Sequence, residues 1–260
     1  GRGFDYTVNL ATGCTVDCAF CYVPAIFRAT RPAAAAAWGT EIEVKANAAA
    51  LLREAGARGQ LTGKAIYISS VTEPFLPAVE PVTRAVLAAL AEFPPRRVVL
   101  QTHLHRVADC LDALLPLGGR VAISLSVPTD SESVRRLFEP RASPIPKRLE
   151  ALARLRDAGV EACLTVAPVL PILDPERFAR ETEPLARAAI FSPFHAPKQS
   201  GRAGTRDRAV SILEAHPEWG DWLDPKARPE EAFQVFRRVW GAERVGYDVE
   251  GFARLARGDA

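Results

Sequence analysis

Three cysteines lie close together near the start of the chain: Cys14, Cys18 and Cys21, in the segment GCTVDCAFCY. Thiolates are soft ligands that suit zinc and iron–sulfur clusters. A four-iron cluster usually takes four cysteines, so three leave one iron open to another ligand, much as a catalytic zinc keeps an open position. The spacing therefore predicts a metal centre. A zinc site with a fourth ligand elsewhere, or purely structural or disulfide-bonded cysteines, are the alternatives.

The other two cysteines, Cys110 and Cys163, stand alone in apolar segments, which is typical of core residues. A clustered, odd-numbered set favours metal binding in a reducing compartment over disulfides, so we expect a cytoplasmic protein. Because the chain starts at Gly1 and contains no methionine, we expect that a native N-terminal segment is missing.

The composition excludes several classes of protein. With 260 residues, 48% hydrophobic and 25% charged, the chain can bury a core without disulfides and is not disordered. It has no apolar run of about 18 residues, so we expect no membrane span. A net charge of +2 and a pI near 8.4 do not by themselves indicate nucleic-acid binding.

Segments typical of strands and of helices alternate along the chain. Strands are predicted over 6–10, 65–69, 97–102, 121–126, 160–167 and 188–192, and helices over 47–54, 81–93, 107–115, 146–158 and 174–187. Six such units with apolar strands predict a parallel sheet that is covered on both faces. A full eight-unit barrel takes about 250 residues, and the six units here end near residue 192. We therefore expect an α/β fold, a partial (β/α)6 TIM-like barrel over residues 1–195. A small C-terminal helical appendage over 196–260 would pack on it.

The cysteine motif, CxxxCxxC with an aromatic residue before the last cysteine, resembles that of the radical S-adenosylmethionine (SAM) superfamily. Further segments are similar to its spore photoproduct lyase-like branch, also labelled DNA-repair photolyase-like: WGTEIEVKANAAALL, ISSVTEPFLPAVEP, and FEPRASPIPKRLEALARLRDAGV followed by a strand and PVLP. The resemblance implies a 4Fe–4S cluster whose open iron chelates the amino and carboxylate groups of SAM. One electron then cleaves SAM to a 5′-deoxyadenosyl radical, which abstracts hydrogen from a substrate.

The resemblance also implies roles for single residues. Cys14, Cys18 and Cys21 would bind the cluster, and Phe20 would lie against the adenine. Ser70, Thr72 and Glu73 would receive the methionine amino group, and His103 stands where the branch carries a lysine for the carboxylate. Ser124 and Ser126 would bond the ribose or carboxylate, and Val169 would touch the adenine. For each of these the alternative is ordinary packing, or a charge at a helix entrance in the case of Glu73.

The substrate and the catalytic residue are not assigned by these patterns. The spore lyase uses a cysteine at the end of its second strand to return hydrogen to the product radical. This chain has Ser69-Ser70 there, and a serine O–H bond is too strong for that role, which argues against photoproduct lyase activity itself. Glu139 lies near two arginines, Arg141 and Arg148; they form either a buried Glu–Arg pair or a contact to cofactor or anionic substrate. A basic loop with Lys198, Arg202, Arg206 and Arg208 is either a phosphate-binding rim or solvated surface, and Arg135, Arg136 and Arg148 could add to it.

We thus predict a radical SAM enzyme of lyase or transferase type that acts on a nucleic acid or a small molecule. The alternative is a non-catalytic zinc or iron–sulfur binding module. The tail holds no second cysteine motif, so the electron would come from an external one-electron donor of flavodoxin or ferredoxin type.

Overall fold

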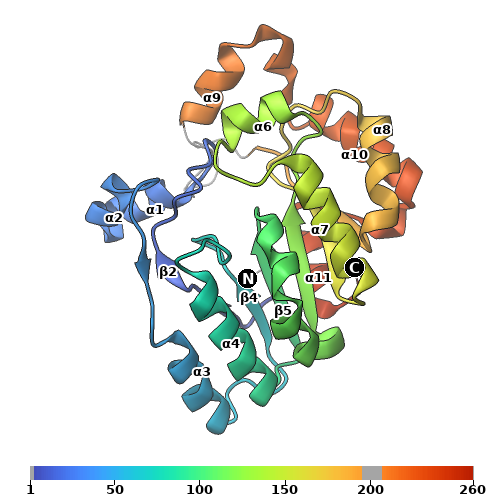
Figure 1. The fold of residues 1–260 in the computed structure, drawn as a ribbon. Helices are drawn as coiled ribbons and strands as arrows, with labels where there is room; N and C mark the ends of the chain where they lie inside the picture. The colour runs from blue at the N-terminus through green and yellow to red at the C-terminus, as the bar shows by residue number, and fades with distance from the viewer. Residues whose placement is uncertain (1–2, 195–206, 260) are drawn as a thin grey trace.

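The computed structural model describes residues 3–194 and 207–259, and a parallel seven-stranded sheet organises them (Figure 1). The strands lie in the order β1-β4-β5-β6-β7-β8-β9. Their bounds are β1 Tyr6–Val8, β4 Ala65–Ile68, β5 Arg97–Thr102, β6 Val121–Ser126, β7 Glu161–Val166, β8 Ala188–Phe191 and β9 Val245–Tyr247. A separate antiparallel pair, β2 (Ala11–Thr12) and β3 (Glu43–Val44), follows β1 and flanks the sheet.

Helices connect the strands and cover the outer face of the sheet (Figure 1). The α-helices are α1 Val23–Thr30, α2 Pro32–Ala36, α3 Ala48–Ala57, α4 Glu80–Glu92, α5 Leu111–Leu114, α6 Glu132–Phe138, α7 Ile145–Asp157, α8 Pro175–Thr182, α9 Asp207–Glu214, α10 Arg228–Trp240 and α11 Asp248–Arg257. Short 3₁₀ helices span His105–Cys110, Leu115–Arg120, Glu183–Leu185, Pro217–Trp222 and Ala242–Arg244. Several starts follow local rules: the Asp174 side chain accepts from the Arg177 amide at 3.0 Å, and Pro175 begins α8.

Alternate residues of each strand enter two different cores. Ile66 and Leu100, for example, face the helices in a large cluster, whereas Tyr67 and Val99 belong to a smaller one. The smaller cluster consists of Tyr67, Val99, Ala122, Cys163, Ala188 and Ile190 from the strands, with Phe252 and Leu255 from α11. Helix α11 therefore packs on the inner face of the curved sheet, opposite the covering helices.

The predicted α/β fold class is confirmed, and the tail contributes one element that the sequence did not predict. Strand β9 pairs in parallel with β8 and extends the sheet to a seventh strand. It has only three residues, too few for a visible pattern. Gly246 lies so close to Gly251 of α11 that a Cβ atom would approach its backbone to 2.6 Å. The boundary between a core over 1–195 and an appendage over 196–260 stays a prediction.

The helix expected over 107–115 takes a different form. The chain there forms a 3₁₀ helix over His105–Cys110, the one-turn helix α5 and a second 3₁₀ helix over Leu115–Arg120. Pro116 cannot donate a backbone hydrogen bond, and Gly118 has a φ of 56° inside that last segment. Within residues 3–194 and 207–259, no helix is both long and apolar enough to cross a bilayer.

Replacing Cys163 with alanine should cost only packing energy. The thiol is fully buried in the smaller core, and burial raises its pKa to about 12, so it stays neutral. We expect the free energy of unfolding to fall by about 1–2 kcal/mol, measured by chemical denaturation. Complete loss of turnover with intact SAM cleavage would contradict this and give Cys163 a chemical role.

Candidate metal and cofactor site

The three clustered cysteines lie on a loop, residues 13–22, that runs from β2 to α1; we call it the cysteine loop. Gly13 begins it with a φ of 91°, and a Cβ atom there would come within 2.5 Å of the Glu41 carbonyl oxygen. The Cys21 amide donates to the Cys18 carbonyl at 3.1 Å, which turns the chain. Cys14 and Cys18 are buried, and Cys21 is half-buried.

The electrostatics of these thiols fit a bound metal centre. Burial raises the pKa of Cys14 to about 11 and that of Cys18 well above its usual range. Negative charge on Glu139, Cys21 and Cys14 raises the pKa of Cys18 further. Three neighbouring thiolates in a buried loop therefore need a cation to compensate them, and a soft metal centre supplies that charge while taking sulfur ligands.

A buried carboxylate joins the carboxyl ends of β4 and β5. Glu73 accepts hydrogen bonds on one oxygen from the Thr102 hydroxyl at 2.5 Å and the Phe75 amide at 3.1 Å. Its other oxygen accepts from the His103 amide at 2.8 Å. Burial is the largest influence on this group and raises its pKa. Glu73 thus fixes the strand end from which His103 projects.

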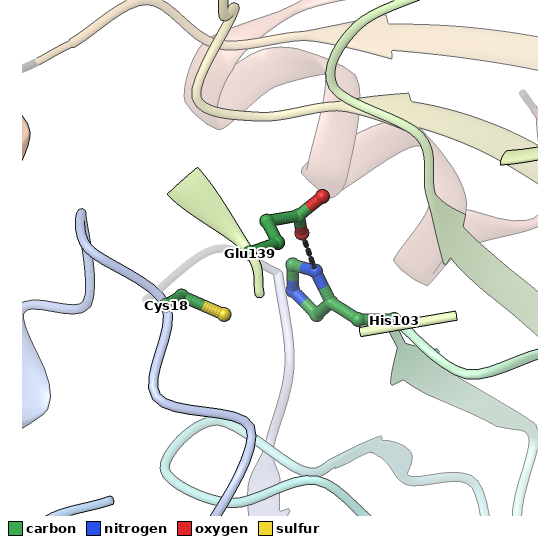
Figure 2. Close-up of side chains that lie close together, drawn as sticks. All are labelled: Cys18, His103 and Glu139. Atoms are coloured by element: carbon green, nitrogen blue, oxygen red, sulfur yellow. Dashed lines mark hydrogen bonds and ion pairs between the residues drawn. The ribbon is translucent and has the colours of Figure 1, made fainter. Parts of the chain in front are cut away.

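A second carboxylate, Glu139, fixes the His103 side chain (Figure 2). The His103 Nδ1 atom lies 2.5 Å from one Glu139 oxygen, and the other oxygen accepts from Arg148 at 2.9 Å. Both side chains of the Glu139–Arg148 pair are fully buried. Burial works to raise the pKa of Glu139, but the Arg148 charge and the His103 contact outweigh it, so the pKa is lowered. The Glu–Arg pair expected from the sequence is present, and it orients a histidine.

The cysteine loop lies beside the hydrogen-bonded His103 and Glu139 side chains. The Cys18 Sγ atom, a ring nitrogen of His103 and a carboxylate oxygen of Glu139 lie within 4.8 Å of one another (Figure 2). The Phe20 ring lies 6.2 Å from the His103 ring, centroid to centroid. Segments far apart in sequence therefore converge at the carboxyl edge of the sheet, where barrel enzymes place their active sites.

The two serines predicted to contact a cofactor are both fully buried, and they differ in their hydrogen bonds. The Ser126 hydroxyl has no hydrogen-bond partner within the described parts of the chain, which costs about 1–3 kcal/mol unless a ligand satisfies it. The Ser124 hydroxyl is already bonded to Thr165 at 2.6 Å. Val169 is fully buried, and its amide donates to the Ser192 carbonyl.

The SVTEP segment, residues 70–74, is held by hydrogen bonds to Asn9 and to Gly13. The Ser70 amide and hydroxyl both donate to the Asn9 side chain, at 3.0 and 3.2 Å. The Thr72 hydroxyl donates to the Gly13 carbonyl at 2.7 Å. The segment therefore lies against the start of the cysteine loop, beside Cys14.

The structure describes part of the basic rim considered above, and most of the arginines that it describes there are bonded internally. Arg135 and Arg148 are buried, with Arg135 bonded to the Glu132 carboxylate and to the Glu139 carbonyl. Arg208 donates to the Asp17 carboxylate at 2.9 Å and to the Asp17 carbonyl at 2.5 Å. Among the arginines predicted there, Arg136 alone is exposed within the described chain; Lys198, Arg202 and Arg206 lie outside the described residues.

Three arginines hold the cysteine loop and the end of β2 just before it, and the sequence did not predict this set. Arg31 donates to the Thr12 hydroxyl at 2.8 Å, Arg141 donates to the carbonyls of Thr15 and Gly39, and Arg208 holds Asp17. They come from α1–α2, from the turn after α6 and from α9. Their separation in sequence leaves no local signal. Only the fold brings them together.

A family model provides the deciding observation. The model described as the radical SAM superfamily matches residues 8–182, two thirds of the chain, and includes the cysteine loop, Glu73, His103 and Glu139. This chain belongs to the radical SAM superfamily. Members of this superfamily bind a 4Fe–4S cluster and SAM. The three thiols and the unpartnered Ser126 hydroxyl fit that pair of groups.

Curated relatives of this radical SAM chain carry no stated activity. This chain is 29% identical over 173 residues to the uncharacterized protein ORF301 of Acidianus two-tailed virus. The matched region covers 64% of this chain and 56% of the relative. It is 23% identical over 192 residues to the uncharacterized protein MJ0683 of Methanocaldococcus jannaschii, covering 73% and 70%. The chain thus spans little more than half the length of the first of these relatives.

Solved structures share the fold. A spore photoproduct lyase variant with bound AdoMet and dinucleoside spore photoproduct superimposes with a TM-score of 0.61 at 19% identity, covering 93% of this chain and 75% of that one. The radical SAM methyltransferase TsrM from Kitasatospora setae superimposes with a TM-score of 0.54 at 13% identity, covering 96% and 55%. At these identities the likeness shows the fold alone.

Proposed function

We propose that this chain takes up one electron, cleaves SAM reductively and abstracts hydrogen from a substrate. The observation that carries the proposal is the meeting of the Cys18 thiol with the His103–Glu139 pair at the carboxyl edge of a radical SAM fold. When bound, the cluster and SAM supply a 5′-deoxyadenosyl radical. The protein binds and orients both groups and keeps water and stray hydrogen donors away from them.

Different residues bind the cluster and contact SAM. Cys14, Cys18 and Cys21 hold the cluster as thiolates. His103, oriented by Glu139, and the unpartnered Ser126 hydroxyl supply polar contacts to SAM, which has charged amino and carboxylate groups. Phe20 provides an apolar wall beside His103 against which a purine ring can stack.

The substrate is a nucleic acid or a small molecule, and photoproduct lyase activity is not part of the proposal. The β4 end carries Ser69-Ser70, both close to Asn9, and no cysteine. Of the arginines that the sequence offered for phosphates and that the structure describes, Arg135 and Arg208 make internal bonds, which weakens the case for a nucleic acid. Free thiols and an oxygen-labile centre suit a reducing compartment, so we place the protein in the cytoplasm.

The proposal is tested with anaerobically purified, iron-reconstituted protein. We expect a brown protein with about four irons per chain, which forms 5′-deoxyadenosine from SAM after reduction. Deuterated candidate substrates then show which compound transfers deuterium into the 5′-deoxyadenosine. A colourless protein with one tetrahedral zinc, or an iron protein that never cleaves SAM, would support a non-catalytic binding module instead.

Replacing Glu73 with glutamine should weaken SAM binding more than cluster binding. The amide keeps the size of the carboxyl group but carries no charge. Its NH2 group replaces one oxygen and so faces a donor, either the Phe75 amide or the His103 amide. We expect the KM for SAM to rise about tenfold, with iron content unchanged. Glu80→Gln, on the outer helix α4, is the matched control. Equal KM values for both variants would show that Glu73 does not act on SAM.

A further inference from the structure

The outer face of α1 is an exposed surface directly beside the cysteine loop. Tyr22, Ala25, Ile26, Arg28 and Arg31 are exposed, whereas Val23, Pro24 and Phe27 face the core. We call the five exposed residues the α1 face. Ile26 has 44% and Tyr22 37% of its surface exposed, which is high for large apolar side chains. In Figure 1, α1 and α2 project from the sheet at one side of the molecule.

The α1 face is positively charged. From Cys18 to Thr40 the chain contains two arginines, Arg28 and Arg31, and no aspartate or glutamate. Arg141, which is also exposed, adds a third positive charge where it bonds the carbonyls of Thr15 and Gly39. The carboxylates that flank this stretch are Asp17, which Arg208 neutralises, and the exposed Glu41 and Glu43, so Arg28 is the arginine of the stretch farthest in sequence from any of them. An apolar centre with a cationic rim is typical of a protein-binding surface for an acidic partner.

The α1 face directly adjoins the cluster ligands in the chain. Cys21 is the half-buried member of the three cysteines, and Tyr22, the next residue, begins the α1 face. The Tyr22 hydroxyl donates to the Ser70 carbonyl at 3.0 Å, which ties the Tyr22 ring to the first residue of the SVTEP segment. Electron transfer between proteins weakens steeply with distance, so a donor must bind close to the cysteine loop, which the α1 face adjoins.

We propose that the α1 face is the docking surface for a small acidic electron-carrier protein of flavodoxin type. This rests on the proposed function, which requires one electron from outside. The carrier is oxidised by one electron and the cluster is reduced by one electron, with no transfer of a proton or a group. Base stacking on single-stranded nucleic acid would need several aromatic rings along a basic groove, and the α1 face offers only Tyr22.

The experiment compares Arg28→Glu with Arg120→Glu. Arg28 lies on the α1 face, whereas Arg120 is exposed at the opposite, amino-terminal edge of the sheet, just before β6. Both variants reverse one surface charge and change the net charge equally. Reduced flavodoxin drives 5′-deoxyadenosine formation in one series, and dithionite, which needs no docking surface, drives it in the other. Flavodoxin binding is measured separately by calorimetry at low ionic strength.

We expect Arg28→Glu to lower the flavodoxin-driven kcat/KM about tenfold and to weaken flavodoxin binding by a similar factor, with less dependence on salt. Its dithionite-driven rate and iron content should match those of the wild type, and Arg120→Glu should match the wild type in every assay. Equal flavodoxin binding by both variants would overturn the proposal. An Ile26→Glu variant that converts a dimer into a monomer, with flavodoxin binding unchanged, would also overturn it and assign the face to a second copy.

The proposed function fails in a different way. If the wild type forms no 5′-deoxyadenosine even with dithionite, the enzyme proposal is wrong, while the binding measurement still decides whether the α1 face recognises the carrier.

Discussion

Cys18→Ala protein should contain almost no cluster iron and form no detectable 5′-deoxyadenosine, yet remain folded. Cys18 is the central of the three thiols, and its sulfur lies nearest to His103 and Glu139. Two remaining thiolates leave a second iron without a protein ligand, which a cluster does not tolerate. The fold does not depend on this residue, because the two apolar cores of the sheet lie elsewhere.

The measurement is iron content and visible absorption after anaerobic reconstitution, with circular dichroism to confirm folding. Cys110→Ala is the matched control, because Cys110 is equally buried but lies in the 3₁₀ helix after β5, outside the cysteine loop. The control should keep its iron and its activity. Full iron and activity in Cys18→Ala would show that the ligand assignment is wrong.

Arg148→Met should produce the largest loss of stability among single substitutions at the site. The Arg148 guanidinium is fully buried and donates to Glu139, to the Ser126 carbonyl at 2.7 Å and to the Ser143 carbonyl at 2.7 Å. Methionine fills much of the space but leaves Glu139 as an uncompensated buried carboxylate. We expect the free energy of unfolding to fall by about 3–5 kcal/mol, measured by urea denaturation of the apoprotein.

Two further variants separate charge from packing in this prediction. Arg154→Met changes an exposed arginine on the same helix, paired with Asp109, and should cost less than about 1 kcal/mol. The double variant Glu139→Gln/Arg148→Met removes the orphaned charge and should recover part of the stability that Arg148→Met loses. If Arg148→Met and Arg154→Met lose the same stability, the buried pair does not stabilise the fold as described.

Much of the fold was predictable because its signals are local. The strands around Ile66, Leu100 and Ile123 are continuous apolar runs, and the helices between them begin at prolines such as Pro81 and Pro175. Strand β9 was not predictable, because three residues carry no period. Its position depends on β8 and on the close contact of Gly246 with Gly251.

In the site, the cysteine loop was predictable from the sequence, whereas the orientation of His103 was not. The cysteine loop has a spacing that depends only on nearby residues, so the sequence shows it directly. The orientation of His103 depends on Glu139 and Arg148, which lie 36 and 45 residues further along the chain; the sequence suggested that pair but not its contact with the histidine. The sequence left Arg208 as either a phosphate contact or a solvated residue, and it could not show the partner, Asp17, which lies 191 residues away.

Helix α11 has a consequence for how the protein reaches its folded state in a cell. This helix covers Tyr67, Val99 and Cys163 on the inner face of the sheet, and the ribosome makes it after every strand it covers. Until translation has passed residue 257, that apolar face has no cover, and a nascent chain with an open sheet is prone to aggregate. A nonsense mutation or proteolytic cut before α11 would therefore be expected to yield insoluble protein, even though it spares all three cluster ligands.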